Sequence, residues 1–116
     1  MKRNLILFVE DILENIELLE KSTGNISKEE LEDNLDIRDA TVRRLEVIGE
    51  AVKNIPNSFR EKYPLVPWKK VAGLRDIIIH AYFGLDLDVI WSIVKNDIFP
   101  LKKQIEEILE KERIVD

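Results

Sequence analysis

Hydrophobic residues recur along this chain at intervals of three and four, the spacing of helices that bury one face. The spacing is clearest near the start, where the apolar positions are Leu5, Val9, Ile12, Ile16 and Leu19. We therefore expect a helix over Lys2–Ser22, ended by Gly24-Asn25, because these two residue types tolerate the backbone turn that closes a helix. Strands are not expected, because no long alternating run stands between turn residues.

The next segment predicts a long second helix. Ser27-Lys28-Glu29-Glu30 has the pattern of a capping box, in which a serine and a glutamate satisfy free backbone N–H groups at a helix start. The helix is expected to pause near Asn34–Asp36 and then to continue until Pro56 ends it. Its apolar stripe is Ile37, Leu45, Ile48, Val52 and Ile55. A short helix is expected over Asn57–Tyr63.

A third helix is expected from Trp68 to Gly84, because the preceding proline, Pro67, suits a first helical position. Its run Ile77-Ile78-Ile79 is compatible with a strand. A lone strand would have no partner, however, so we expect a helix that is buried on most sides.

The last helix is expected to start after Asp86 as N-cap and to run to Arg113, with a kink or division at Pro100. The whole pattern predicts an all-α fold, an antiparallel bundle of four to five helices forming one domain over residues 1–116.

Composition narrows the chemistry that is open to this chain. It has 116 residues, 18 basic and 23 acidic, and a net charge of −5, which argues against a surface that wraps nucleic acid on all sides. A local basic pocket remains compatible with this charge. There is no cysteine and one histidine, so thiol chemistry, cysteine–zinc sites and a multi-histidine metal site within one chain are excluded. We expect no cofactor.

No apolar run is long enough to cross a membrane. Glu10 and Asp11 interrupt the first apolar stretch, which makes a poor signal peptide. We therefore expect a cytoplasmic protein.

One stretch, residues 75–82, concentrates polar groups within an apolar helix. It carries Arg75, Asp76, the single histidine His80, and Tyr82. At about 100° per residue, Arg75 and Tyr82 share a helix face, whereas Arg75 and His80 are about 140° apart. A shared site therefore needs the long reach of arginine, a distortion near Gly73, or a second copy of the helix in a homodimer. The alternative is a set of ordinary structural residues.

The sequence resembles the HepT-like toxins of the HEPN superfamily, which are small helical ribonucleases. The resemblance spans nearly the full length and keeps its order. It is carried by Arg43–Ala51 with its Gly-Glu-Ala core, Pro67–Arg75, Arg75-x4-His80-x-Tyr82, Asp86–Trp91 and Pro100-Leu101. It implies a homodimer whose two motifs face each other, cleavage of RNA (tRNA or mRNA) without a metal, and a small nucleotidyltransferase antitoxin. The antitoxin can add AMP to the motif tyrosine, here Tyr82.

The side-chain chemistry of the motif residues is also suited to RNA cleavage, independently of the resemblance. A histidine side chain ordinarily titrates near pH 6.5, about where a general acid or base is effective at neutral pH. Arginine can hold phosphate oxygens and stabilise the charge of the transition state. RNA supplies its own nucleophile, the 2′-hydroxyl, so no metal site is needed. The candidate catalytic residues are therefore Arg75 and His80, with Tyr82 as a binding or modification site.

Other residues are candidates for supporting roles. Asp76 is a candidate for orienting Arg75 or His80, and Glu50 for pairing with Arg75 or with Arg43. Lys69 and Lys70 are candidates for contacts to RNA phosphates. Two further readings stay open: a non-catalytic helical module that binds a nucleotidyltransferase or a nucleotide, and a purely structural dimer.

Overall fold

The computed structural model describes residues 3–83 and 86–115, and every regular element in these ranges is a helix. The prediction of an all-α fold is therefore confirmed. The elements are α1 (Arg3–Thr23), α2 (Lys28–Asp33), α3 (Leu35–Lys53), α4 (Asn57–Arg60), α5 (Trp68–Ala72), α6 (Leu74–Phe83), α7 (Leu87–Ser92), the π-helical η1 (Ile93–Ile98) and α8 (Phe99–Val115).

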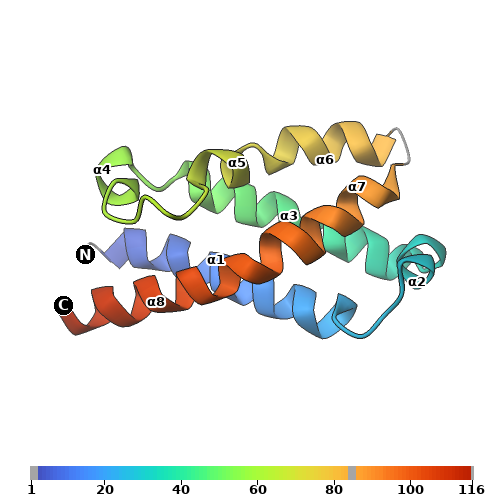
Figure 1. Cartoon of the computed structure of the whole chain (residues 1–116). Helices are drawn as coiled ribbons and strands as arrows, with labels where there is room; N and C mark the ends of the chain where they lie inside the picture. Colours follow the sequence, from blue (N-terminus) through green and yellow to red (C-terminus); the bar gives the residue numbers. More distant parts are fainter. Residues whose placement is uncertain (1–2, 84–85, 116) are drawn as a thin grey trace.

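The helices lie along the long axis of a body that measures 45 × 25 × 22 Å. The chain runs back and forth along this axis, first in α1, then back in α3, forward in α5 and α6, and back in α7, η1 and α8 (Figure 1). The helix α3 packs against α1 on one side and against α5 and α6 on the other, while α8 packs against α1. This arrangement is antiparallel, as the sequence predicted.

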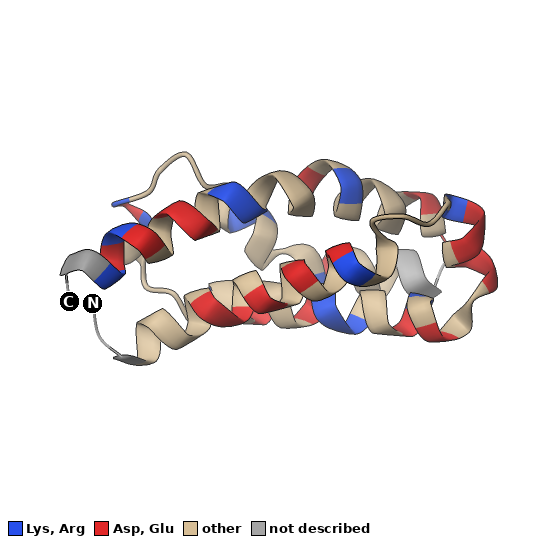
Figure 2. Cartoon of the chain, turned by 90° about the horizontal axis from the view of Figure 1, so that it is seen from below, with Lys and Arg blue, Asp and Glu red and all other residues tan. Residues whose placement is uncertain are grey.

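The core consists of the apolar stripes that the sequence pattern indicated. Its most deeply buried members include Ile12, Ile16, Leu19, Leu45, Ile48, Ile78, Ile98 and Leu101. Leu5 and Ile37, which belong to the predicted stripes, are only half-buried at its edge. On the side shown in Figure 2 the charged positions of α1 are mostly acidic, whereas α8 carries both acidic and basic positions.

Local signals placed the first helix boundaries correctly. At Gly24 a Cβ atom would come 2.5 Å from the carbonyl oxygen of Glu20, so the turn that ends α1 needs glycine. The Ser27 side chain accepts a hydrogen bond of 3.1 Å from the backbone N–H of Glu30 and caps α2. The pause expected over Asn34–Asp36 is a single residue, because Asn34 ends α2 and also caps α3.

The second half of the chain departs from prediction at two places. The third helix is divided at Gly73 into α5 and α6. The helix expected over Asn57–Tyr63 is limited to α4, after which hydrogen-bonded turns follow. The predicted stop at Gly84 and the start at Lys2 lie outside the described residues.

The disturbance at Pro100 takes the form of a π-helical segment immediately before it. Proline has no N–H, and its ring clashes with the carbonyl of the residue four positions earlier in an α-helix. In η1 the wider turn moves the hydrogen bonds to a spacing of five, as in the bond from Phe99 N–H to the Val94 carbonyl. The cap Asp86 is as predicted, because its side chain accepts from the N–H of Val89.

None of the helices in the described part of the chain is long and apolar enough to span a membrane.

Candidate active site on helix α6

The helix α6 carries the candidate motif and is anchored by one face only. Leu74 and Ile78 point into the core, where both are essentially inaccessible. Gly49 of α3 makes close packing possible here, because a Cβ atom at this position would lie only 3.2 Å from the carbonyl oxygen of Val71. Val71 belongs to α5, and the same Cβ atom would lie 3.6 Å from Cβ of Leu74, so the close packing at Gly49 sets the position of both α5 and the start of α6 against α3.

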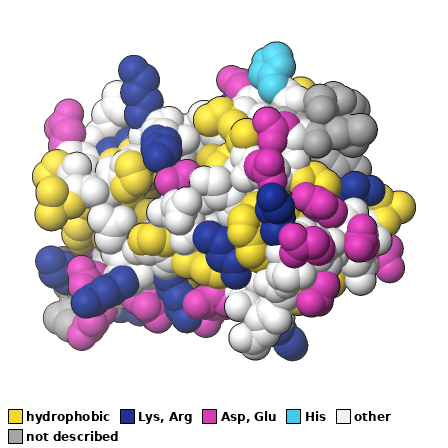
Figure 3. Space-filling model, turned by 45° about the vertical axis from the view of Figure 1, so that its right-hand side comes forward, with side chains coloured by type: hydrophobic (Ala, Val, Ile, Leu, Met, Phe, Trp, Pro, Cys, Tyr) yellow, Lys and Arg dark blue, Asp and Glu magenta, His cyan; other side chains and the backbone are white. Residues whose placement is uncertain are grey.

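The remaining side of α6 is exposed and carries Arg75, Asp76 and His80 together with two isoleucines. The side chains of Ile77 and Ile79 are 42% and 39% exposed. The expectation of a helix buried on most sides is therefore wrong, because α3 and α7 cover only part of its circumference. The single histidine, His80, stands at the surface close to hydrophobic side chains (Figure 3).

Arg75 is held from the neighbouring helix α3. Its guanidinium Nη1 lies 3.7 Å from the carboxylate Oε2 of Glu50, and both side chains are about half exposed. Of the two partners that the sequence offered to Glu50, the structure therefore shows Arg75 and not Arg43. At this distance the contact is an ion pair and too long for a hydrogen bond.

The structure does not bring Arg75 and His80 together within one chain. Both lie in the continuous helix α6, five residues and about 140° apart. The break at Gly73 comes before Arg75, so it leaves the angle between the two side chains unchanged. Asp76 is exposed between them and forms no ion pair among the described residues. The backbone of Tyr82 lies in α6, but its side chain is outside what the structure describes.

The two candidate lysines have different surroundings. Lys69 and Lys70 are both exposed on α5. The Lys70 Nζ pairs with the carboxylate of Asp97 on η1 at 3.0 Å, so its charge is already compensated. Lys69 forms no ion pair among the described residues and is the one of the two with an uncompensated charge.

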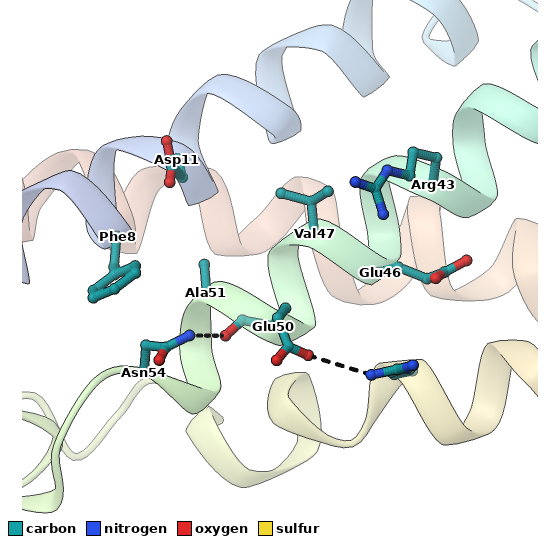
Figure 4. Close-up of a pocket in the computed structure, with 9 residues that line it drawn as sticks. Phe8, Asp11, Arg43, Glu46, Val47, Glu50, Ala51 and Asn54 are labelled. Atoms are coloured by element: carbon teal, nitrogen blue, oxygen red, sulfur yellow. Dashed lines mark hydrogen bonds and ion pairs between the residues drawn. The ribbon is translucent and has the colours of Figure 1, made fainter.

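Sequence reasoning missed a groove that begins beside Arg75. It has a volume of about 370 Å³ and lies between α1 and α3 (Figure 4). Phe8 and Asp11 line it from α1, and Arg43, Glu46 and Glu50 from α3. The spacing of these residues along each helix indicates that each set shares one helix face. The sequence does not indicate that the set on α1 meets the set on α3, because that depends on how the two helices pack.

The described residues contain no cluster of three or more histidine, cysteine, aspartate or glutamate side chains that could hold a metal ion. The described part of α6 exposes Arg75, Asp76 and His80 together with Ile77 and Ile79.

Comparison with known proteins identifies the class to which such a site belongs. A family model described as "Ribonuclease HepT-like" matches residues 12–108. "Gamma-glutamylcyclotransferase and putative RNase" of Methanocaldococcus jannaschii is 44% identical over 111 residues, which are 96% of this chain and 50% of that protein. "Probable ribonuclease HepT" of Thermococcus cleftensis is 46% identical over 108 residues, 93% of this chain and 98% of that protein. No solved structure matches significantly.

This chain therefore belongs to the HepT-like ribonuclease family, an enzyme family. The resemblance seen in its motifs is confirmed over most of its length. This chain spans about half of the first relative and nearly all of the second.

Proposed function

We propose that this protein is a metal-independent endoribonuclease, the toxin of a toxin–antitoxin pair, whose active groove forms where the α6 helices of two copies meet. The observation that carries the proposal is the exposure of Arg75 and His80 on one helix that also exposes Ile77 and Ile79. The exposed side of α6 thus combines charged and polar side chains with two partly exposed isoleucines, a mixture that also occurs at interfaces between protein chains.

A two-fold pairing would complete the site that one chain leaves incomplete. If two α6 helices meet antiparallel, with the axis between Ile77 and Ile78, residues 75 and 80 lie at equal distances from it. Arg75 of one copy then stands level with His80 of the other, so that a single groove across the two-fold axis contains both histidines and both arginines. The isoleucines between them would supply the apolar contact.

The reaction follows from the groups in this groove. One His80 accepts the proton of the RNA 2′-hydroxyl, whose oxygen attacks the adjacent phosphorus. The bond from phosphorus to the 5′-oxygen breaks, and this oxygen takes a proton from the second His80. Arg75 stabilises the additional negative charge on the phosphoryl oxygens. The products are a 2′,3′-cyclic phosphate and a 5′-hydroxyl.

Tyr82 is the site at which the activity would be silenced. A small nucleotidyltransferase antitoxin transfers AMP from ATP to the Tyr82 hydroxyl, forming a phosphodiester and releasing pyrophosphate. The added group occupies the groove and places negative charge where an RNA phosphate must bind. The substrate is tRNA or mRNA in the cytoplasm, and Lys69 is the lysine that is free to contact its backbone.

The test is cleavage of end-labelled tRNA and single-stranded RNA in EDTA. We expect His80→Ala and Arg75→Ala to lower the rate by about 10²- to 10⁴-fold. Arg113→Ala is the matched control, because Arg113 is an equally exposed arginine paired with a glutamate, Glu10, at 3.0 Å. Cleavage that persists in His80→Ala, or that EDTA abolishes, contradicts the proposal. Tight binding of a nucleotidyltransferase without any cleavage would favour the non-catalytic module.

A further inference from the structure

The groove between α1 and α3 has the form of a small-ligand site. Its volume of about 370 Å³ lies within the range of about 300–1,000 Å³ that is usual for such sites. Val47 and Ala51 form apolar wall, and the half-buried ring of Phe8 stands at one end (Figure 4). Arg75 lines the groove as well, so an occupant would lie directly beside the candidate catalytic group.

The charges of the groove favour a nucleobase over a phosphate. Three carboxylates line it, those of Asp11, Glu46 and Glu50, against the two guanidinium groups of Arg43 and Arg75. This excess of negative charge would repel a phosphate inside the groove. A base carries no charge, and its N–H groups can donate hydrogen bonds to a carboxylate.

Several of these groups are free to bind a ligand. Glu50 is committed to Arg75. Glu46 and Arg43, by contrast, form no ion pair with another described residue. The amide nitrogen of Asn54 donates to the Glu50 carbonyl at 2.9 Å, which leaves its Oδ1 as a further acceptor. The groove is thus rich in acceptors, with free donors on the Arg43 guanidinium and on the second N–H of the Asn54 amide.

We propose that this groove binds a base of the RNA next to the cleaved phosphate and selects guanine. The inference rests on the proposed ribonuclease function, which supplies the RNA. Guanine has two neighbouring donors, N1–H and the N2 amino group, and one carboxylate can accept a hydrogen bond from each of them. It also has acceptors at O6 and N7, the atoms that arginine reads. Glu46 and Arg43 are three residues apart on α3 and so lie on neighbouring turns. They present one carboxylate and one guanidinium side by side.

The other bases match this pair less well. Adenine and cytosine each present an amino donor without an adjacent ring N–H, and uracil presents a ring N–H alone. Single-stranded RNA is generally recognised through the edges of such unstacked bases and by stacking on aromatic rings. Phe8 provides the ring at the end of the groove.

The first measurement uses 2′-O-methyl dinucleotides of each base, which cannot be cleaved. Each is titrated into the full chain, and its binding is monitored by the NMR chemical shifts of the protein's backbone amides. We expect the guanine dinucleotide to shift the amides of Phe8, Glu46 and Asn54. We expect Glu46→Gln to weaken this binding by about 5- to 100-fold. Glu61→Gln is the matched control, because Glu61 is exposed, outside the groove and without an ion pair among the described residues. Equal shifts with all four bases, or shifts elsewhere only, overturn the proposal.

The second measurement is the sequence at the cleavage sites of a random RNA. We expect guanine beside the cut, and a loss of rate when inosine, which lacks the N2 amino group, replaces it. His80-dependent cleavage without a base preference overturns the inference and leaves the ribonuclease function intact. Guanine binding in the groove without His80-dependent cleavage supports the inference and contradicts the proposed function.

Discussion

The guanidinium of Arg75 on α6 is held by the carboxylate of Glu50 on α3, with 3.7 Å between Nη1 and Oε2. The pair joins the first residue of the motif to the helix that also anchors α6 through Gly49. Because both side chains are about half exposed, the pair contributes less than about 1 kcal/mol to the free energy of unfolding. We expect its main effect to be a restriction on where the guanidinium points.

Glu50→Gln is therefore expected to lower kcat of RNA cleavage by about 3- to 30-fold, because poorly oriented catalytic groups lose rate steeply. The unfolding free energy should stay within about 1 kcal/mol of the original protein. Steady-state kinetics and urea unfolding measure the two effects. Glu10→Gln is the control, since Glu10 forms a similar exposed pair with Arg113 at 3.0 Å. An unchanged kcat would remove Glu50 from any positioning role.

Two glycines should respond in opposite directions to alanine. At Gly49 a Cβ atom would lie 3.2 Å from the backbone oxygen of Val71, which cannot move without shifting α5. We expect Gly49→Ala to destabilise the protein by about 1–3 kcal/mol, as overpacked core positions do. At Gly73 the corresponding contacts are 3.5 and 3.6 Å, so Gly73→Ala should be neutral or stabilising by up to about 1 kcal/mol. Thermal unfolding of both variants tests this, and equal melting temperatures would contradict it.

The exposed isoleucines of α6 should control assembly. Ile79→Glu is expected to convert a dimer into a folded monomer, because a charge would be buried in the proposed interface. RNA cleavage should fall by about 10²-fold or more with it, since the proposed composite site needs two chains. Light scattering coupled to gel filtration measures the mass. Leu65→Glu is the control, because Leu65 is 89% exposed and lies away from α6. A dimeric, active Ile79→Glu protein would contradict the composite site.

A buried glutamate should make stability depend on pH. Glu112 of α8 accepts hydrogen bonds from the Tyr63 hydroxyl and from Lys62 at 3.0 Å. The bond from Tyr63, with the one from Lys62, holds the pKa of the Glu112 carboxyl below its ordinary value of 4.5. Burial, with the bond to Glu112, raises the pKa of Tyr63 to about 12.

The lowered pKa of Glu112 and the raised pKa of Tyr63 determine how the free energy of unfolding changes with pH. Glu112 stabilises the fold above its unfolded pKa, and this contribution is lost as the pH falls through 4.5 and below. Tyr63 stabilises the fold below pH 10, and its contribution is lost as the pH rises towards 12. We expect Glu112→Gln to cost about 1 kcal/mol at pH 7, the difference between a charged and a neutral acceptor. Urea unfolding at pH 7 and pH 3 measures it, and a cost that does not shrink at pH 3 would contradict this account.

The features that sequence predicted well are those that depend on neighbours along the chain. The cap at Ser27, the end at Pro56 and the start at Asp86 each follow from one side chain and the backbone next to it. The apolar stripes could also be predicted from the sequence, because apolar residues spaced by three and four positions lie on one face of a helix, and that face is buried. The motif helix was expected on the same grounds.

The features that sequence did not predict depend on packing between distant segments. The break at Gly73 occurs where Gly49 brings α3 against Val71, a contact 22 residues away along the chain. The exposure of Ile77 and Ile79 depends on how many helices cover α6, which their apolar character alone does not reveal. The groove at Glu46 exists because α1 lies across α3.

The ion pair between Arg113 and Glu10 joins the last turns of α8 to the first turns of α1, so both ends of the described chain lie at the same end of the bundle (Figure 1). The helix α6 lies toward the other end. A further domain fused to either terminus would therefore project away from the motif helix and leave its exposed side accessible. A longer polypeptide in which the matching region is about half of the length, as in the Methanocaldococcus jannaschii relative, is therefore sterically compatible with the proposed pairing through α6.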